Sequence, residues 1–200
     1  EIFNLFSQIC LGLHHIHSHN IIHRDLKTNN IFISGTGPSK VLKIGDFGIS
    51  KVMSSKSNAE TVVGTPSYLS PELCEGKPYN VKSDIWALGC ILYELVCLHR
   101  LFEGSNLPAL VMKIMRGTYE PIPSPPFSSH LQTLIASCVR LNPDARPAMS
   151  SIMALPVMQE HLIEAQLGMG RVAPVDYVGF VAAGNSLVGL DRLATRRSRA

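Results

Sequence analysis

The chain has 200 residues, of which 46% are hydrophobic, and a formal net charge of +3. This length and composition suffice for one buried core in a single domain, and so small a charge argues against nucleic acid and membrane surfaces as partners. The five cysteines include no Cys-x-x-Cys pair, which indicates neither a disulfide framework nor a zinc site and favours a reducing intracellular compartment.

The first third of the chain predicts a helix, a hairpin and a loop. Apolar residues at helical spacing from residue 2 predict an amphipathic helix that ends near Ser18. Short strands at 30–33 and 41–44 are joined by a connection rich in turn residues, so we expect a β-hairpin. Residues 49–70 are polar and have no period, which predicts a long loop of the kind that is usually functional in a compact domain.

The remainder of the chain is predicted to be helical. The run 85–95 is apolar on nearly all sides, which indicates a helix through the middle of the core. Further helices are expected at about 107–115, 130–139 and 150–155, so the fold class is mainly α with a small β-hairpin. We expect a domain at 1–155 and a weakly ordered tail at 156–200, in which 158–167 has a helical pattern.

Two polar segments lie at the ends of the predicted hairpin. His23-Arg24-Asp25-Leu26-Lys27-Thr28-Asn29-Asn30 precedes it, and Asp46-Phe47-Gly48 follows it. Because a hairpin brings its ends together, Asp46 is expected beside the first segment. Phosphoryl transfer needs a carboxylate that orients the attacking hydroxyl, ligands for Mg²⁺, and cations that offset phosphate charge. The spacing therefore predicts a metal–phosphate site formed by two adjacent loop ends.

These two motifs, with Ser70-Pro71-Glu72 after them, resemble the catalytic loop and the magnesium-binding motif of the protein kinase family. The resemblance implies that Asp25 is the catalytic base and that Asn30 and Asp46 bind Mg²⁺. It also implies that Lys27 neutralises the phosphate of ATP. The cofactors expected are therefore ATP and Mg²⁺.

The resemblance also indicates the class of kinase. Lys27 and Thr65, in Gly64-Thr65-Pro66, are typical of serine/threonine kinases, in which Thr65 would bridge Asp25 and Lys27 below the substrate hydroxyl. Thr61 is the preferred phosphorylation site in the loop, where a phosphate would pair with Arg24. For most hydroxyls of this loop, the alternative is that they only keep it soluble.

Five residues are expected to support the site. The resemblance implies that His23 packs behind the metal motif and that Asp84 accepts hydrogen bonds from the catalytic-loop backbone. Glu72 and Arg146 resemble the buried ion pair of the family, and removal of either partner should be strongly destabilising. Arg24 is the fifth.

A group of histidines at the end of the first helix comprises His14, His15, His17 and His19. His15 and His19 are four residues apart and form a usable pair of metal ligands, but no nearby Glu, Asp or Cys completes a set of three or four. Solvated histidines are therefore the favoured interpretation.

Within the family, residues 64–73 and 79–90 resemble the NIMA-related kinases. The Gly-rich loop, the strand lysine and the helix glutamate of a complete kinase are not found in the chain, which begins within a predicted helix. We therefore expect the larger, C-terminal lobe, with the smaller β-rich lobe absent.

Two functions remain open at this point. The first is a serine/threonine kinase, recorded in part, that phosphorylates Ser and Thr hydroxyls of protein substrates with ATP and Mg²⁺. The second is a catalytically inactive, lobe-only module that binds proteins. Sequence upstream of Glu1 would discriminate between them. We also expect self-association through the exposed lobe face, and a cytoplasmic location with the nucleus or the cytoskeleton as alternatives.

Overall fold

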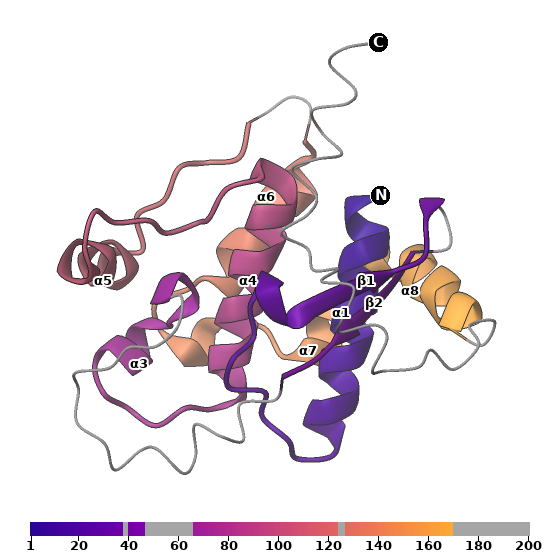
Figure 1. The fold of residues 1–200 in the computed structure, drawn as a ribbon, viewed down its shortest axis with the longest axis horizontal. Helices are drawn as coiled ribbons and strands as arrows, with labels where there is room; N and C mark the ends of the chain where they lie inside the picture. The colour runs from indigo at the N-terminus through magenta and orange to yellow at the C-terminus, as the bar shows by residue number, and fades with distance from the viewer. Residues whose placement is uncertain (38–39, 47–65, 124–126, 170–200) are drawn as a thin grey trace.

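The structure is a computed structural model and describes residues 1–37, 40–46, 66–123 and 127–169. The described part is mostly helical and carries one antiparallel two-stranded sheet (Figure 1). Its α-helices are α1 (Ile2–Ser18), α3 (Pro71–Cys74), α4 (Val81–Cys97), α5 (Leu107–Arg116), α6 (Ser129–Cys138), α7 (Met149–Met153) and α8 (Pro156–Met169). The strands are β1 (Ile31–Ser34) and β2 (Val41–Ile44), and the 3-10 turns are η1 (Thr28–Asn30), η3 (Pro66–Tyr68) and η4 (Pro143–Ala145). The predicted helices and hairpin are confirmed within a few residues.

One side chain of α1, that of Gln8, makes two hydrogen bonds to the hairpin. Gln8 on α1 donates from Nε2 to the Lys40 carbonyl at 3.1 Å, and its Oε1 accepts from the Leu42 amide at 2.9 Å. After the strands, the Gly45 amide continues the ladder by donating to the Asn30 carbonyl at 2.9 Å. A Cβ at residue 45 would lie 2.6 Å from the Phe32 ring, so the close approach requires glycine. The two ends of the hairpin therefore meet, as the sequence predicts.

Helix α4 runs through the middle of the fold (Figure 1) and is buried along most of its length. Its first turn is closed by a capping box, in which the Asn80 side chain accepts from the Lys82 amide and the Ser83 hydroxyl accepts from the Asn80 amide. Trp86 is fully buried and stacks on Phe102 with ring centroids 5.5 Å apart. A helix that is apolar all round must lie in the core, and α4 does.

Helix α8 belongs to the segment that the sequence analysis assigned to a weakly ordered tail. It packs along α1: the Ser7 hydroxyl donates to the His161 carbonyl at 3.1 Å, and Met158, Leu162 and Ala165 are buried. These three residues lie on one helical face, which explains the packing. The helix continues to residue 169 and its packing extends to Ala165, past the boundary placed at 155; residues 170–200 lie outside the described part. No helix among the described residues is long and apolar enough to cross a membrane.

A buried ion pair joins α3 to the loop before α7. The Arg146 guanidinium donates two parallel hydrogen bonds to the Glu72 carboxylate, at 2.8 and 2.7 Å, and lies 5.0 Å from the centroid of the Trp86 ring. Arg146 is 2% exposed and Glu72 is 4% exposed. The remaining guanidinium protons are bonded to backbone carbonyls, including those of Arg140 and Lys82. The pair therefore has the geometry that offsets the cost of burying two charges.

This ion pair makes stability depend on pH. Burial alone would raise the pKa of Glu72, but hydrogen bonds from Arg146 and Ser83 outweigh it and lower that pKa to about 2. The folded pKa lies below the unfolded value of roughly 4.3, so the carboxylate stabilises the fold above the unfolded value and loses this contribution as the pH falls toward the folded one.

We therefore predict that Glu72→Gln lowers the free energy of unfolding most above about pH 5, and that the gap from the wild type narrows as the pH falls to about 2. Urea titrations of both proteins across this range measure the gap. Glu160→Gln, at an exposed position on α8, is the control and should show little gap at any pH. A Glu72→Gln gap that does not change with pH would contradict the assignment.

Two buried serines beside this ion pair differ in their hydrogen bonding. The Ser83 hydroxyl donates to Glu72 Oε1 at 2.7 Å, whereas the Ser70 hydroxyl, at the N-cap of α3, has no partner within the described residues. Both side chains are almost fully buried. Burial of a hydroxyl without a partner is unfavourable, and removal of a bonded one leaves its partner unsatisfied.

The same substitution at these two positions should therefore have different effects. We predict that Ser70→Ala leaves the free energy of unfolding unchanged or raises it by up to roughly 1 kcal/mol, and that Ser83→Ala lowers it by roughly 1–3 kcal/mol. Chemical denaturation of the two variants is the measurement. Equal destabilisation by both substitutions would refute the difference.

Candidate active site

The predicted catalytic residues of the first segment meet around one carboxylate oxygen. Asp25 Oδ2 accepts from Lys27 Nζ at 2.8 Å and from Asn30 Nδ2 at 3.2 Å. Asn30 Nδ2 also donates to the Asp25 carbonyl at 2.8 Å, which fixes the turn η1 between them. The Asp25 and Lys27 side chains are 23% and 18% exposed, so this cluster is accessible at one side. The cluster combines an oriented carboxylate with a cation and an amide.

His23 connects the two segments through its two ring nitrogens. Its ring is buried, its Nδ1 accepts from the Asp25 amide at 3.3 Å, and its Nε2 lies 3.1 Å from the Gly45 carbonyl. Nε2 must therefore carry the proton that it donates to that carbonyl. Burial lowers the pKa of His23, and the nearby carboxylate of Asp84 counteracts this only in part. A neutral ring is the form that satisfies both contacts. His23 therefore links the Asp25 amide to the Gly45 carbonyl by hydrogen bonds.

Asp84, in the first turn of α4, holds the backbone of this segment. Its two oxygens accept from the amides of His23 and Arg24 at 2.9 and 3.2 Å, and from the Tyr79 hydroxyl at 2.8 Å. Arg24 adopts a left-handed backbone with φ of 68°, which is uncommon for a residue other than glycine. The two adjacent amides thus turn toward the same carboxylate, and the predicted support by Asp84 is present in the structure.

His17 contradicts the interpretation of the histidine group as solvated. Its Nε2 lies 2.8 Å from Asp84 Oδ2, and its side chain is only 11% exposed. His14, His15 and His19 are exposed, as expected. A 3.6-residue period places position 17 on the side of α1 that faces α4, which the histidine spacing by itself does not reveal.

Asp46 directly follows the hairpin and has a left-handed backbone, with φ of 52°, and an exposed side chain. Its carboxylate and that of Asp25 both lie close enough to His23 to raise the pKa of that ring, against the larger effect of burial. The structure therefore brings Asp46 to the first segment. Phe47, Gly48, Thr61 and Thr65 lie outside the described residues.

A hydrogen-bonded triad that the sequence analysis missed links the first segment to α4. The Thr28 hydroxyl bonds to the Tyr68 hydroxyl at 2.7 Å and to Glu94 Oε1 at 3.3 Å, and Tyr68 also donates to Glu94 Oε2. Burial and the Glu94 carboxylate raise the pKa of Tyr68, so it remains a donor at physiological pH. These residues are 26 to 66 positions apart in sequence, so only the fold reveals the triad.

The residues expected to bind Mg²⁺ have suitable ligand atoms. Asn30 Nδ2 is committed to Asp25, which leaves its Oδ1 as the available ligand atom, and Asp46 offers an exposed carboxylate. Mg²⁺ is typically bound by one or two carboxylates together with substrate phosphates. Across the described ranges, no group of three or more His, Cys, Asp or Glu side chains is arranged to hold a metal ion. This donor set fits a metal that arrives with phosphate ligands.

Comparison with known proteins gives the family. The sequence model of the protein kinase domain matches residues 1–158. The chain is 54% identical over 171 residues to serine/threonine-protein kinase Nek8 of Danio rerio, a match that covers 86% of this chain and 24% of that protein. It is 46% identical over 173 residues to serine/threonine-protein kinase nekl-2 of Caenorhabditis elegans, covering 86% of this chain and 48% of that protein. The chain belongs to the protein kinase family.

The relatives also agree with the resemblance to NIMA-related kinases. Serine/threonine-protein kinase Nek5 of Homo sapiens is 49% identical over 168 residues, which is 84% of this chain and 23% of that protein. The three relatives carry the names of Nek-type serine/threonine-protein kinases. The chain spans less than half the length of each of them.

The support by Asp84 is testable. Asp84→Asn replaces one acceptor oxygen by an amide nitrogen, so at least one of its donors loses its partner. We predict that the His23 and Arg24 amides exchange hydrogen at least about 10-fold faster and that the free energy of unfolding falls by roughly 1–3 kcal/mol. Exchange measured by NMR is the direct readout, and Asp144→Asn, at an exposed position on η4, is the control. Unchanged exchange at both amides in a folded variant would rule out this role.

Proposed function

We propose that this chain forms the catalytic floor of a serine/threonine protein kinase, which transfers the γ-phosphate of ATP to Ser and Thr hydroxyls of protein substrates. The observation that supports this most directly is the Asp25 carboxylate, oriented by Lys27 at 2.8 Å and Asn30 at 3.2 Å. An ion pair that only stabilises the fold does not need a partly exposed carboxylate, a cation and an amide to lie together on one short loop. Phosphoryl transfer requires this combination.

In this proposal, Asp25 orients the substrate hydroxyl and accepts its proton. Lys27, beside it, supplies positive charge where the transferred phosphoryl group carries negative charge. Asn30 and Asp46 would hold Mg²⁺, which neutralises phosphate charge when it is bound. Thr65 would bridge Asp25 and Lys27 on the floor where the acceptor Ser or Thr lies.

We further propose regulation through Arg24 and Thr61. Arg24 is partly buried and forms no ion pair within the described residues. Its backbone amide donates to Asp84, which fixes the position of the backbone from which the Arg24 side chain extends. A phosphate on Thr61 would give this cation a partner and order the loop between Asp46 and Glu72.

The larger-lobe assignment is also part of the proposal. The sequence of 200 residues contains no Gly-x-Gly-x-x-Gly motif, and a kinase needs a loop of this kind over the phosphates. We propose that a smaller β-rich lobe provides it and that the 200 residues alone do not transfer phosphate. The second candidate function, an inactive module that binds proteins, would then describe the isolated chain. We expect this isolated chain to self-associate through the face that a smaller lobe would cover. A cytoplasmic, nuclear or cytoskeletal location rests on the resemblance alone.

Transfer of labelled phosphate from ATP with Mg²⁺ tests the proposal. In a longer product that contains the Gly-rich loop, we predict transfer to Ser and Thr peptides but not Tyr peptides, and a loss on the order of 100- to 10,000-fold in Asp25→Asn. Asp144→Asn is the matched control. Full turnover by Asp25→Asn would overturn the assignment of the base. Turnover by the 200 residues alone, abolished by Asp25→Asn, would instead overturn their proposed inactivity.

A further inference from the structure

Asp84 holds the backbone that precedes Asp25, and two side chains in turn orient Asp84. His17 Nε2 on α1 lies 2.8 Å from Asp84 Oδ2, and the Tyr79 hydroxyl donates to Asp84 Oδ1 at 2.8 Å. Oδ2 also accepts from the His23 amide at 2.9 Å, and Oδ1 accepts from the Arg24 amide at 3.2 Å. Each carboxylate oxygen therefore has one donor from the segment that it holds and one side-chain donor from another part of the fold.

In the contact between His17 and Asp84, the imidazole must be the donor. The Asp84 side chain is fully buried and accepts from two backbone amides and a phenol hydroxyl besides His17. An ionised carboxylate only accepts hydrogen bonds, whereas imidazole Nε2 donates when it carries a proton. An unprotonated Nε2 at 2.8 Å would instead set its lone pair against that of Oδ2. His17 Nε2 therefore carries a proton, and its bond to the buried anion is charge-assisted.

The orientation of this carboxylate matters because it holds two consecutive amides. Its two oxygens lie in one plane with the carbon that bears them, so a rotation that moves one oxygen also moves the other. Arg24, the second of the two residues, has a left-handed backbone with φ of 68°. A backbone of this kind persists only where the surrounding contacts hold it. Loss of one side-chain donor should therefore loosen the amides of both His23 and Arg24.

We propose that His17 and Tyr79 are positioning residues, which act on the candidate active site through Asp84. They form a clamp with one donor on each carboxylate oxygen, and the clamped carboxylate fixes the backbone from which Asp25 extends. His17 belongs to the last turn of α1, so the rotation of that helix enters the geometry of the site. The role of the clamp in phosphate transfer rests on the proposed kinase function, whereas its effect on the backbone does not.

Two substitutions of similar length separate the hydrogen bond of His17 from its packing. Glutamine offers an Nε2 donor and methionine offers none, and both side chains are unbranched and favour helices. In the chain of 200 residues, we predict that His17→Met speeds hydrogen exchange at the His23 and Arg24 amides at least about 10-fold, and that His17→Gln speeds it less than about 3-fold. NMR measures both rates. Equal acceleration in the two variants, or none in His17→Met, would overturn the proposal.

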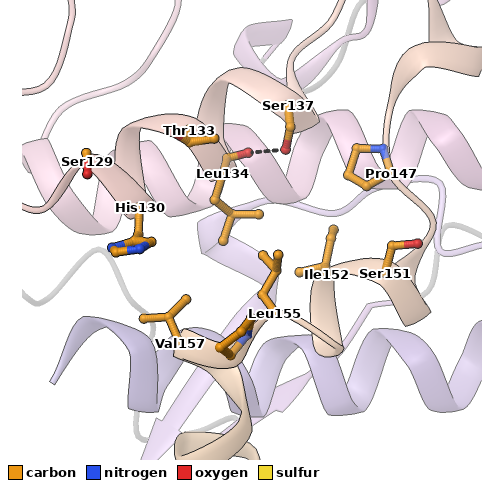
Figure 2. A pocket seen from close by; sticks show the side chains of 11 residues that line it. Ser129, His130, Thr133, Leu134, Ser137, Pro147, Ser151, Ile152, Leu155 and Val157 are labelled. Atoms are coloured by element: carbon orange, nitrogen blue, oxygen red, sulfur yellow. Dashed lines mark hydrogen bonds between the residues drawn. The ribbon is translucent and has the colours of Figure 1, made fainter.

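A hydrogen bond beside the cavity between α6, α7 and the start of α8 provides the control. There the Ser137 hydroxyl donates to the Leu134 carbonyl at 2.7 Å (Figure 2). Ser137→Ala also deletes a side-chain donor, but none of the donors to Asp84 lines this cavity. The two amides should therefore exchange at the wild-type rate in Ser137→Ala. Acceleration as large as in His17→Met would show that the effect does not pass through Asp84.

Tyr79→Phe removes only the hydroxyl that bonds to the other oxygen of Asp84. Because His17 and Tyr79 act through one carboxylate, the loss of either donor already lets it turn. The double variant should therefore speed exchange by less than the product of the two single effects. A full product would mean that the two residues act independently and would contradict the clamp. If His17→Met does not fold, the imidazole nitrogen chemical shifts of the wild type decide instead, because an unprotonated His17 Nε2 would refute the proposal.

Phosphate transfer tests the consequence for the chemistry. In a longer product that contains the Gly-rich loop, we predict that His17→Met lowers kcat about 10-fold while KM for ATP stays within about 2-fold, and that His17→Gln keeps most of the wild-type kcat. An unchanged kcat in His17→Met would contradict the positioning role. Absence of turnover in the wild-type product would instead contradict the proposed function, and hydrogen exchange would still decide whether the clamp holds the backbone.

Discussion

The buried carboxylate of Asp84 is the interaction on which the candidate site depends. It is fully buried and accepts hydrogen bonds from the amides of His23 and Arg24, from the Tyr79 hydroxyl and from the His17 ring. Burial of a carboxylate is strongly unfavourable unless such donors surround it. The donors come from α1, from the first polar segment (residues 23–30) and from the loop before α4, so these three parts of the chain must converge for the charge to be tolerated.

Helix α4 also fixes the distance between the two residues that hold the first polar segment, Asp84 and Glu94. Asp84 in its first turn holds the beginning of that segment, and Glu94 holds its Thr28 through the triad with Tyr68. Asp84 and Glu94 are ten residues apart, which corresponds to about 15 Å along the axis of an α-helix. Because α4 is rigid and buried, it sets the placement of Asp25 between these contacts.

The sequence predicted the elements better than the contacts between them. Helical spacing located α1, an apolar run located α4, and two short strands joined by turn residues located the hairpin, because each of these patterns is local. The meeting of Asp25, Lys27 and Asn30 was also predictable, since all three lie within six residues. The contact of His17 with Asp84 and the triad of Thr28, Tyr68 and Glu94 depend on helix rotation and on pairs up to 67 residues apart, which one sequence does not reveal.

Helix α8 extends the packing around α1 beyond the residues that the family model matches. The family match ends at residue 158, yet α8 continues to residue 169 and packs on α1, where Phe3 stacks on His161 with ring centroids 5.9 Å apart. The opposite end of α1 carries His17, which contacts the buried carboxylate of α4. A helix is stiff over this length, so fixing one end of α1 constrains the other. We infer that α8 helps to hold α1 in the rotation that places His17 against Asp84.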